Sequence, residues 1–219
     1  MSYSSTGKVT NGMPKLSCSR SQSKRSRYDV LVIDPPWPKK KGGLRDVRPR
    51  QGRELGYATL DAATIFALLD RDIFVQAKER HSVFLWGIDQ FLHIGEHAME
   101  QRGYRRHARL IWDKGNGVAP AFSIRYTHEY ITWFYKSKFQ PVSLETRGKF
   151  RTVLHEPARQ HSRKPDILYN LIKLWYPTAA CLDVFSRESR NGWESWGNET
   201  DFFHSEHVNT GKVDSCPLD

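Results

Sequence analysis

The chain has 219 residues, enough for one domain with a sizeable core. Lysine and arginine outnumber aspartate and glutamate by 34 to 24, which gives a formal net charge of +10. An excess of this size favours a nucleic-acid partner through phosphate contacts, but it does not separate DNA from RNA. The sequence shows no secretory signal and no long apolar run, so we expect no membrane association.

The three cysteines, Cys18, Cys181 and Cys216, are widely scattered. They form no Cys-x-x-Cys pair, so we expect neither a disulfide framework nor a metal site. This cysteine usage predicts an intracellular protein, which would be cytoplasmic in a prokaryote or phage and nuclear in a eukaryote.

The composition divides the chain into a central domain and two tails. Residues 1–27 are rich in Ser, Lys and Arg, which is typical of a flexible basic tail. Residues 204–219 lack periodicity and predict a loose C-terminal tail. Residues 28–203 remain as one folded domain.

The first predicted element is a buried parallel strand over 28–34, because Tyr28 to Ile33 is an apolar run. The tetrapeptide Asp34-Pro35-Pro36-Trp37 ends it. An ionised Asp34 only accepts hydrogen bonds, and the prolines lack N–H groups, which leaves nearby carbonyls free to accept. Trp37 offers a flat face for stacking. The corner suits a planar group whose exocyclic amine donates to Asp34 and to the Pro35 carbonyl.

A long polar loop over 35–58 follows the strand. Loops of this length inside compact domains are usually functional or disordered, and this one is rich in basic residues. We favour a loop that grips nucleic-acid phosphates, and a solvated loop without contacts is the alternative. The candidate residues are Lys39, Lys40, Lys41, Arg45, Arg48, Arg50 and Arg53. A second basic candidate is the connection over 136–150.

The remaining elements alternate between strands and helices. Helices are predicted at about 61–70, 89–101 and 165–175. Strands are predicted at 82–86, 109–112, 129–135, 151–154 and 179–185. This alternation predicts an α/β fold with a mostly parallel sheet flanked by helices. Trp86, Trp112 and Trp133 lie in strands, so we expect them to pack in the core.

The segment His161-Ser162-Arg163-Lys164-Pro165-Asp166 opens the last helix. Pro165 suits the first helical turn, and a helix N-terminus carries partial positive charge with free N–H donors. Lys164 adds a full charge. The segment therefore predicts a site for a carboxylate, although an ordinary helix start with a solvated lysine fits equally well.

Several segments in order resemble the MT-A70 family of adenine-N6 methyltransferases, over about residues 28–200. The first is Asp-Pro-Pro-Trp, and the Lys164-Pro165 helix start is the second. A third is the strand and turn Leu182-Asp183-Val184-Phe185-Ser186-Arg187. The fourth is Gly-Trp-Glu-Ser-Trp-Gly-Asn-Glu over 192–199, and a weaker match is Gly-Tyr-Ala-Thr-Leu over 56–60. The chain lacks a Gly-x-Gly-x-x-Gly after the first strand, which argues against an ordinary dinucleotide fold.

The resemblance implies a single Rossmann-like methyltransferase domain with a permuted motif order, which uses S-adenosylmethionine (SAM). The catalytic residues would be Asp34, Pro35, Pro36 and Trp37, and Tyr57 would face the substrate. The implied cofactor-binding residues are Ile33, Asp34, Lys164, Asp183, Phe185, Arg187, Ser189, Arg190, Asn198 and Glu199. Ser189-Arg190 departs from the His-Asn of some members, which puts the ribose contacts in doubt. His128-Glu129 and Trp112-x-Lys114 also agree with the family pattern, and we assign them structural roles first.

The implied reaction is direct in-line methyl transfer to the N6 amine of adenine, with positioning and electrostatics as the driving terms. DNA is the favoured substrate, since the sequence shows no Cys/His zinc module for RNA targeting. RNA is the first alternative, and an inactive nucleic-acid-binding or scaffold subunit is the second. Methylation of cytosine N4 is disfavoured, because that chemistry usually shows Ser-Pro-Pro. The sequence leaves open a protein partner or a homodimer.

Overall fold

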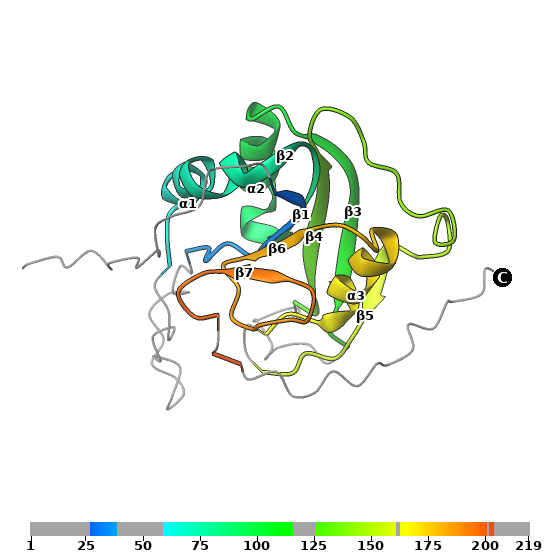
Figure 1. Ribbon diagram of the computed structural model, residues 1–219. Coiled ribbons are helices and arrows are strands. Elements are labelled where there is room, and N and C mark those ends of the chain that lie inside the picture. Colours follow the sequence, from blue (N-terminus) through cyan, green and yellow to red (C-terminus); the bar gives the residue numbers. More distant parts are fainter. Residues whose placement is uncertain (1–26, 39–58, 116–125, 161–162, 201, 204–219) are drawn as a thin grey trace, which may run out of the picture.

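The computed structural model describes residues 27–38, 59–115, 126–160, 163–200 and 202–203 (Figure 1). In these ranges seven strands form one sheet, in the order β5-β3-β4-β2-β1-β6-β7. The strands are β1 (Tyr28–Ile33), β2 (Ala77–Gly87), β3 (Arg105–Asp113), β4 (His128–Tyr135), β5 (Val153–His155), β6 (Cys181–Val184) and β7 (Glu194–Trp196). β4 runs antiparallel to β2 and β3, while the other neighbouring pairs are parallel. The predicted α/β class with a mostly parallel sheet is confirmed.

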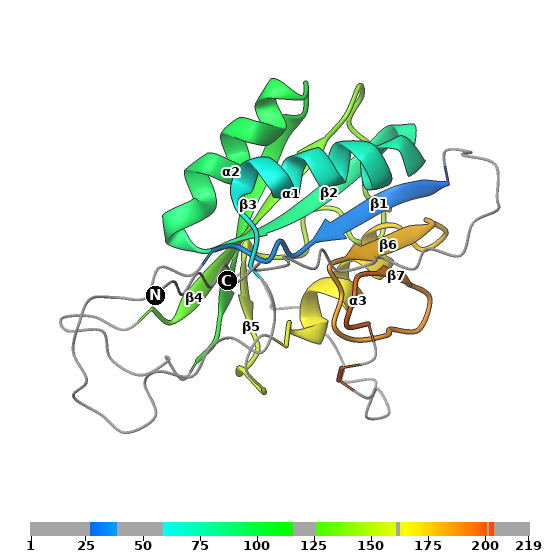
Figure 2. The same cartoon turned by 90° about the vertical axis from the view of Figure 1, so that its left-hand side faces the viewer.

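Helices cover both faces of the sheet. α1 (Ala62–Leu68) and α2 (Asp89–Gln101) lie on one face, and α3 (Asp166–Trp175) lies on the other (Figure 2). β1 shows why, because its side chains alternate: Leu31 and Ile33 enter the core under α1 and α2, whereas Val30 and Val32 enter the core under α3. Burial on both faces explains the continuous apolar run in the sequence.

The helix ends follow local sequence signals. Asp61 caps α1 by accepting a hydrogen bond from the Thr64 N–H at 2.8 Å. α1 continues into a π-helical turn over Leu69–Ile73 and a 3₁₀ turn over Phe74–Gln76, which the sequence did not predict. α2 ends at Gln101, and Gly103 follows its C-cap with a φ of 76°, which suits glycine. No helix in the described ranges combines the length and apolar character needed to cross a membrane.

The strand order brings particular strand ends together. β1 lies between β2 and β6, with α1 connecting on one face and α3 leading into β6 on the other. Ligands of open α/β sheets bind beyond the carboxyl ends of strands at such a switch point. Because β4 is antiparallel, its amino end lies at this same edge. The edge therefore collects Asp34 after β1, Glu129 at the start of β4, and the turn after β6.

Candidate active site

The corner after β1 is fixed by backbone hydrogen bonds. The Asp34 N–H donates to the Val184 carbonyl at 3.1 Å, which ties the corner to β6. The Trp37 N–H donates to the Pro35 carbonyl at 2.7 Å, and the Leu60 N–H donates to the Pro36 carbonyl at 3.0 Å. We expected a free Pro35 carbonyl, but it already accepts the hydrogen bond from Trp37. A carbonyl oxygen has two lone pairs, so it can accept one more hydrogen bond.

Trp37 lies in the core and does not present a face to the site. Its ring stacks on Phe91 with centroids 5.4 Å apart and an interplanar angle of 5°, and only 7% of the residue is exposed. Its Nε1–H donates to the Trp86 carbonyl at 3.2 Å. In this structure apolar burial under α2 holds the Trp37 ring in the core, so Tyr57 is left as the other predicted residue for stacking on a substrate ring. Trp37 anchors the corner instead.

Four side chains of alternating charge meet at the carboxyl edge of the sheet. The Lys164 Nζ lies 3.1 Å from Asp34 Oδ1 and 2.8 Å from Glu129 Oε2. The other oxygen of Glu129, Oε1, accepts from the Lys114 Nζ at 2.7 Å. All four are largely buried, with side-chain exposures between 11% and 22%. We call Asp34, Lys164, Glu129 and Lys114 the charge chain.

Two tryptophans lie against the charge chain. The Lys164 Nζ is 4.8 Å from the ring centroid of Trp86, and the Lys114 Nζ is 5.2 Å from that of Trp112. The ring faces attract the ammonium groups, and this attraction strengthens where water is excluded. Trp86, Trp112 and Trp133 are all buried, which confirms their predicted place in the core.

The charge chain shifts the pKa values of its members. Burial raises the pKa of Asp34, and the neighbouring Lys164 ammonium opposes this only in part. Burial alone would also raise the pKa of Glu129, but Lys164 and Lys114 outweigh it and hold that pKa at about 2. Burial would lower the pKa of Lys164, yet Asp34 and Glu129 raise it above the ordinary value. At neutral pH Glu129 is a carboxylate between two ammonium groups.

The amino end of α3 is already occupied by another carboxylate of the chain. Glu156 accepts hydrogen bonds from the Asp166 N–H at 2.9 Å and the Ile167 N–H at 2.8 Å. Pro165 precedes the helix as its N-cap with extended backbone, one position earlier than predicted. The prediction of a free anion site at this helix end is therefore wrong, because Glu156 satisfies the exposed donors. Of the predicted carboxylate site, only the Lys164 ammonium remains.

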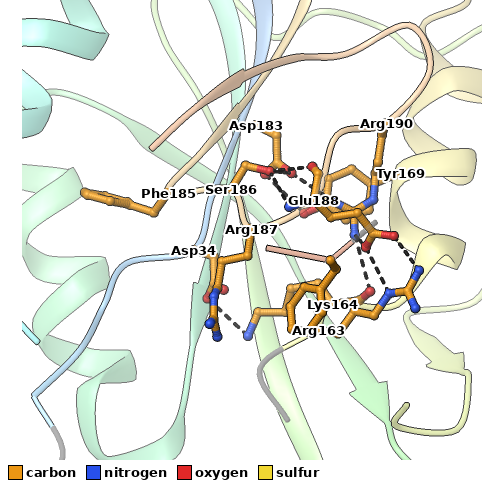
Figure 3. A pocket seen from close by; sticks show the side chains of 11 residues that line it. Asp34, Arg163, Lys164, Tyr169, Asp183, Phe185, Ser186, Arg187, Glu188 and Arg190 are labelled. Carbon is orange, nitrogen blue, oxygen red and sulfur yellow. Dashed lines mark hydrogen bonds and ion pairs between the residues drawn. The ribbon is translucent and has the colours of Figure 1, made fainter. Parts of the chain in front are cut away.

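Asp183 on β6 lies in a second buried polar cluster (Figure 3). Its Oδ1 accepts from the Tyr169 hydroxyl at 3.1 Å, and its Oδ2 accepts from the Ser186 hydroxyl at 2.9 Å. Arg190 Nη1 donates to the same Oδ2 at 3.0 Å. Burial nevertheless raises the pKa of Asp183 to about 6, because desolvation outweighs these favourable partners.

Arg190 belongs to this buried cluster and also lines the cavity beside Asp34 and Lys164. It also donates to Glu188 at 2.8 Å, and its guanidinium lies 3.8 Å from the Tyr169 ring centroid. Glu188 in turn pairs with Arg163 at 2.5 Å. Buried carboxylates engage the Arg190 guanidinium from several sides, and a contact between Arg190 and a cofactor ribose stays a prediction. Ser189 is exposed, and its hydroxyl lies 3.5 Å from the Thr200 carbonyl.

The turn after β6 has an unusual backbone. Phe185 has a φ of 60°, which non-glycine residues seldom adopt, and its ring meets Trp196 edge-on at 5.4 Å. In Figure 3 the Phe185 ring points away from the charged side chains. Gly197 lets the β7 segment approach, because a Cβ there would lie 3.0 Å from the Ser186 carbonyl oxygen. The two segments thus meet backbone to backbone.

Arg187 and Glu199 form an ion pair at the mouth of the same turn. Arg187 Nε lies 2.7 Å from Glu199 Oε2, and its guanidinium lies 4.1 Å from the Phe202 ring centroid. A small cavity of about 10 Å³ lies between this turn, Asp34 and Lys164. A single water molecule needs about 10–15 Å³, so ion-paired side chains fill nearly all of the room.

A model of the MT-A70 family matches residues 28–199. The chain belongs to the MT-A70 family. The resemblance inferred from the motifs is thereby confirmed. Among curated proteins, the chain is 26% identical to a probable N(6)-adenosine-methyltransferase MT-A70-like of Oryza sativa subsp. japonica, over 79% of this chain and 23% of that protein. The chain spans about a quarter of the length of the plant relatives it matches.

Two further relatives align over more of their own length. The type II methyltransferase M.MunI of Mycoplasma sp is 24% identical, over 88% of this chain and 86% of that protein. The N(6)-adenine-specific methyltransferase METTL4 of Mus musculus is also 24% identical, over 85% of this chain and 39% of that protein. MT-A70 relatives thus include one of similar length and several much longer ones.

The structure brings together most of the predicted MT-A70 site residues. Asp34, Lys164, Asp183, Phe185 and Arg187 line the cavity, and the exposed Asn198 and the ion-paired Glu199 follow β7. Ile33 is fully buried at the end of β1. The predicted substrate residues Lys39, Lys40, Lys41, Arg45, Arg48 and Tyr57 lie outside the described residues.

Sequence reasoning underestimated Glu129 and Lys114. Both were given structural roles, yet they complete the charge chain around Asp34 and Lys164. Their signal in the sequence was a charged residue at the end of an otherwise apolar strand, Asp113-Lys114 after one and His128-Glu129 before the next. Only the antiparallel placement of β4 turns that signal into proximity to Asp34.

Proposed function

We propose that the protein is a SAM-dependent methyltransferase that transfers a methyl group to the N6 amine of adenine in DNA. The observation that carries the proposal is the carboxylate of Asp34, held at the end of β1 beside Lys164 and the β6 turn. An aromatic amine is a weak nucleophile, because its lone pair is delocalised into the ring. A protein group that orients this amine toward the methyl donor therefore lowers the barrier to methyl transfer.

Asp34 and the Pro35 carbonyl accept hydrogen bonds from the two N–H groups of the amine, which favours a geometry whose lone pair is localised on nitrogen and points at the methyl donor. SAM, when bound, supplies an electrophilic methyl group, so that an N–C bond forms as the C–S bond breaks. Positive charge develops on the amine nitrogen, and the Asp34 carboxylate stabilises it. The raised pKa of Asp34 also suits this carboxylate to take the proton that the amine then releases.

The residues around the cavity suit SAM. The Lys164 ammonium is a partner for the methionine carboxylate, and Arg187, Asn198 and Glu199 offer polar groups to a nucleoside. The missing Cβ at Gly197 keeps the β7 segment close to the turn. Asp183 and Arg190 also line the cavity, and their mutual ion pair holds them in place.

DNA is preferred over RNA as the substrate class for one reason. The relative that aligns over most of its own length is the type II methyltransferase M.MunI, whereas the plant relatives named for the ribonucleoside adenosine align over about a quarter of theirs. The names of those plant relatives keep RNA as the second candidate. In duplex DNA the adenine would leave the stack to reach Asp34. The net charge of +10 supports a phosphate-bearing partner of either kind.

The test is methyl transfer from labelled SAM to unmethylated DNA and to RNA of matched sequence, with the products digested to nucleosides. Asp34→Ala is run alongside. N6-methyladenine in DNA that disappears in the variant supports the proposal. Label found only in RNA would move the function to the second candidate. SAM binding without transfer to either polymer would contradict a self-sufficient enzyme.

A further inference from the structure

Lys164 forms an ion pair with Asp34, the carboxylate that the proposed reaction needs for the substrate amine. Its Nζ lies 3.1 Å from Asp34 Oδ1, one of the oxygens that would accept the substrate amine. An ammonium at this distance also opposes the positive charge that develops on the amine nitrogen. The inference below rests on the proposed function, and it concerns how Asp34 becomes available.

The Lys164 ammonium cannot give up its ion pair with Asp34 without another carboxylate to replace it. Only 13% of its side chain is exposed, and a buried ammonium without a partner is strongly unfavourable. When the substrate amine takes its place on Asp34, Lys164 therefore needs other carboxylates, and a carboxylate of the chain can hold it together with the methionine carboxylate proposed above. Glu129 is in position to do so, because its Oε2 lies 2.8 Å from Nζ, closer than Asp34.

We infer that Glu129 is a positioning residue that retains the Lys164 ammonium and so releases Asp34 to the substrate amine. Glu129 acts through Lys164 and does not itself touch the amine. It is the second residue of β4 and pairs with Trp112 of β3, so its backbone is fixed by the sheet. Lys114 holds its other oxygen at 2.7 Å, which fixes the carboxylate as well.

The arrangement differs from an ordinary buried ion pair on the same strand pair. Glu96 on α2 accepts from Arg106, Arg109 and Thr132, and none of these partners belongs to the charge chain. Its role is to fasten α2 to β3 and β4. Glu129 instead shares its cation with the catalytic carboxylate. Glu96→Gln is therefore a matched control, since it neutralises a buried carboxylate with two cationic partners away from Asp34.

The experiment is a double-mutant cycle of Glu129→Gln and Lys164→Met, with Glu96→Gln as the control. Three quantities are measured for each variant: kcat and KM for methyl transfer, the Kd of S-adenosylhomocysteine, and the Kd of 5′-methylthioadenosine. The second probe is a thioether nucleoside that lacks the carboxylate. Thermal unfolding reports whether each variant is folded.

We expect Glu129→Gln to lower kcat about tenfold or more, with little change in KM for the nucleic acid, because Lys164 then stays on Asp34. In the Lys164→Met background the same change should lower kcat less than about twofold. S-adenosylhomocysteine should bind Glu129→Gln about threefold more tightly, since the Lys164 ammonium on Asp34 then has one carboxylate fewer beside it and attracts the ligand carboxylate more strongly. The affinity of 5′-methylthioadenosine should not change. Glu96→Gln should affect unfolding and leave both affinities unchanged.

Equal losses of kcat in both backgrounds would overturn the inference, as would parallel weakening of both nucleosides. If Glu129→Gln does not fold, Lys114→Met replaces it in the cycle, because it loosens Glu129 and should lower kcat only when Lys164 is present. Failure of the proposed function itself is distinguishable. It would appear as no N6-methyladenine from the wild-type protein, while the two binding measurements would still report whether Glu129 and Lys164 are coupled.

Discussion

At Asp34, burial and a neighbouring ammonium act on one carboxyl group in opposite directions. Burial raises its pKa and Lys164 lowers it, with burial the larger effect. The same pair of forces acts on Glu129 with the opposite outcome, because Glu129 faces two ammonium groups and its pKa is about 2. Two carboxylates that share one lysine therefore differ in proton affinity. The raised pKa of Asp34 suits a proton acceptor, and the low pKa of Glu129 suits a permanent counter-ion of Lys164.

The raised pKa of Asp34 predicts the acid limb of the activity profile. Asp34 accepts from the amine only when ionised, so kcat/KM should fall as the pH drops, with a midpoint above 3.8, the ordinary pKa of an aspartate. The measurement is kcat/KM between pH 4 and 8, with circular dichroism at each pH to confirm that the protein is folded. A rate that stays constant down to the ordinary aspartate range would contradict this role for Asp34.

The lowered pKa of Glu129 predicts a separate dependence of stability on pH. Its pKa is about 2 in the folded protein and 4.5 ordinarily. Between these values the unfolded chain binds a proton and the folded chain does not, so the free energy of unfolding falls as the pH drops from 4.5 toward 2. Glu129→Gln should remove this part of the slope. Urea unfolding at several pH values checks it, and parallel profiles for the two proteins would argue against the ion pairs.

At the scale of elements, the turn after β6 and the short strand β7 form one wall of the cavity. Their separation is set by Gly197, where an added Cβ would lie 3.0 Å from the Ser186 carbonyl oxygen and 3.2 Å from its nitrogen. Backbone atoms cannot swing aside as a flexible side chain can. A side chain at this position would therefore push β7 away from the turn that carries Arg187.

Gly197→Ala should destabilise the protein by about 1–3 kcal/mol and weaken binding of S-adenosylhomocysteine. Chemical denaturation and calorimetry measure the two effects. Gly87→Ala is the matched control, since a Cβ there would meet Leu92 at 3.6 Å, an ordinary contact. Equal effects of the two substitutions would mean that close approach at Gly197 is unimportant.

Local sequence patterns predicted some elements better than others. The apolar run before Asp34 gave β1 almost to the residue, because a strand buried on both faces has no polar interruption. β2 begins at Ala77, earlier than predicted, since Lys78, Glu79 and Arg80 are exposed and interrupt the apolar pattern. β7 was not predicted as a strand. It has three residues at the sheet edge, too few to show a period.

At the scale of the whole molecule, strand order decides which charges meet. Asp34, Lys114, Glu129 and Lys164 are far apart in the sequence, and the sheet order places them at one edge. The family motifs predicted Asp34 and Lys164. They could not predict that β4 reverses direction and places Glu129 between two lysines, because periodicity carries no information on strand order.

The net charge of +10 predicts that nucleic-acid binding depends strongly on salt. Each phosphate contact releases bound counterions, so the logarithm of the affinity should fall linearly with that of the salt concentration, with a slope of about −0.9 per contact on duplex DNA. Fluorescence anisotropy with a labelled duplex at several salt concentrations measures the slope. An affinity independent of salt would exclude the basic residues as the main source of binding.

The central claim is that the Asp34 carboxylate orients an adenine amine for methyl transfer. The most direct test is the rate of N6-methyladenine formation by Asp34→Asn, measured together with its affinity for S-adenosylhomocysteine. Asparagine keeps the shape of the side chain and removes its charge. We predict a rate at least about 100-fold lower with an affinity within about threefold of the wild type. An unchanged rate, or equal losses of rate and affinity, would contradict the claim.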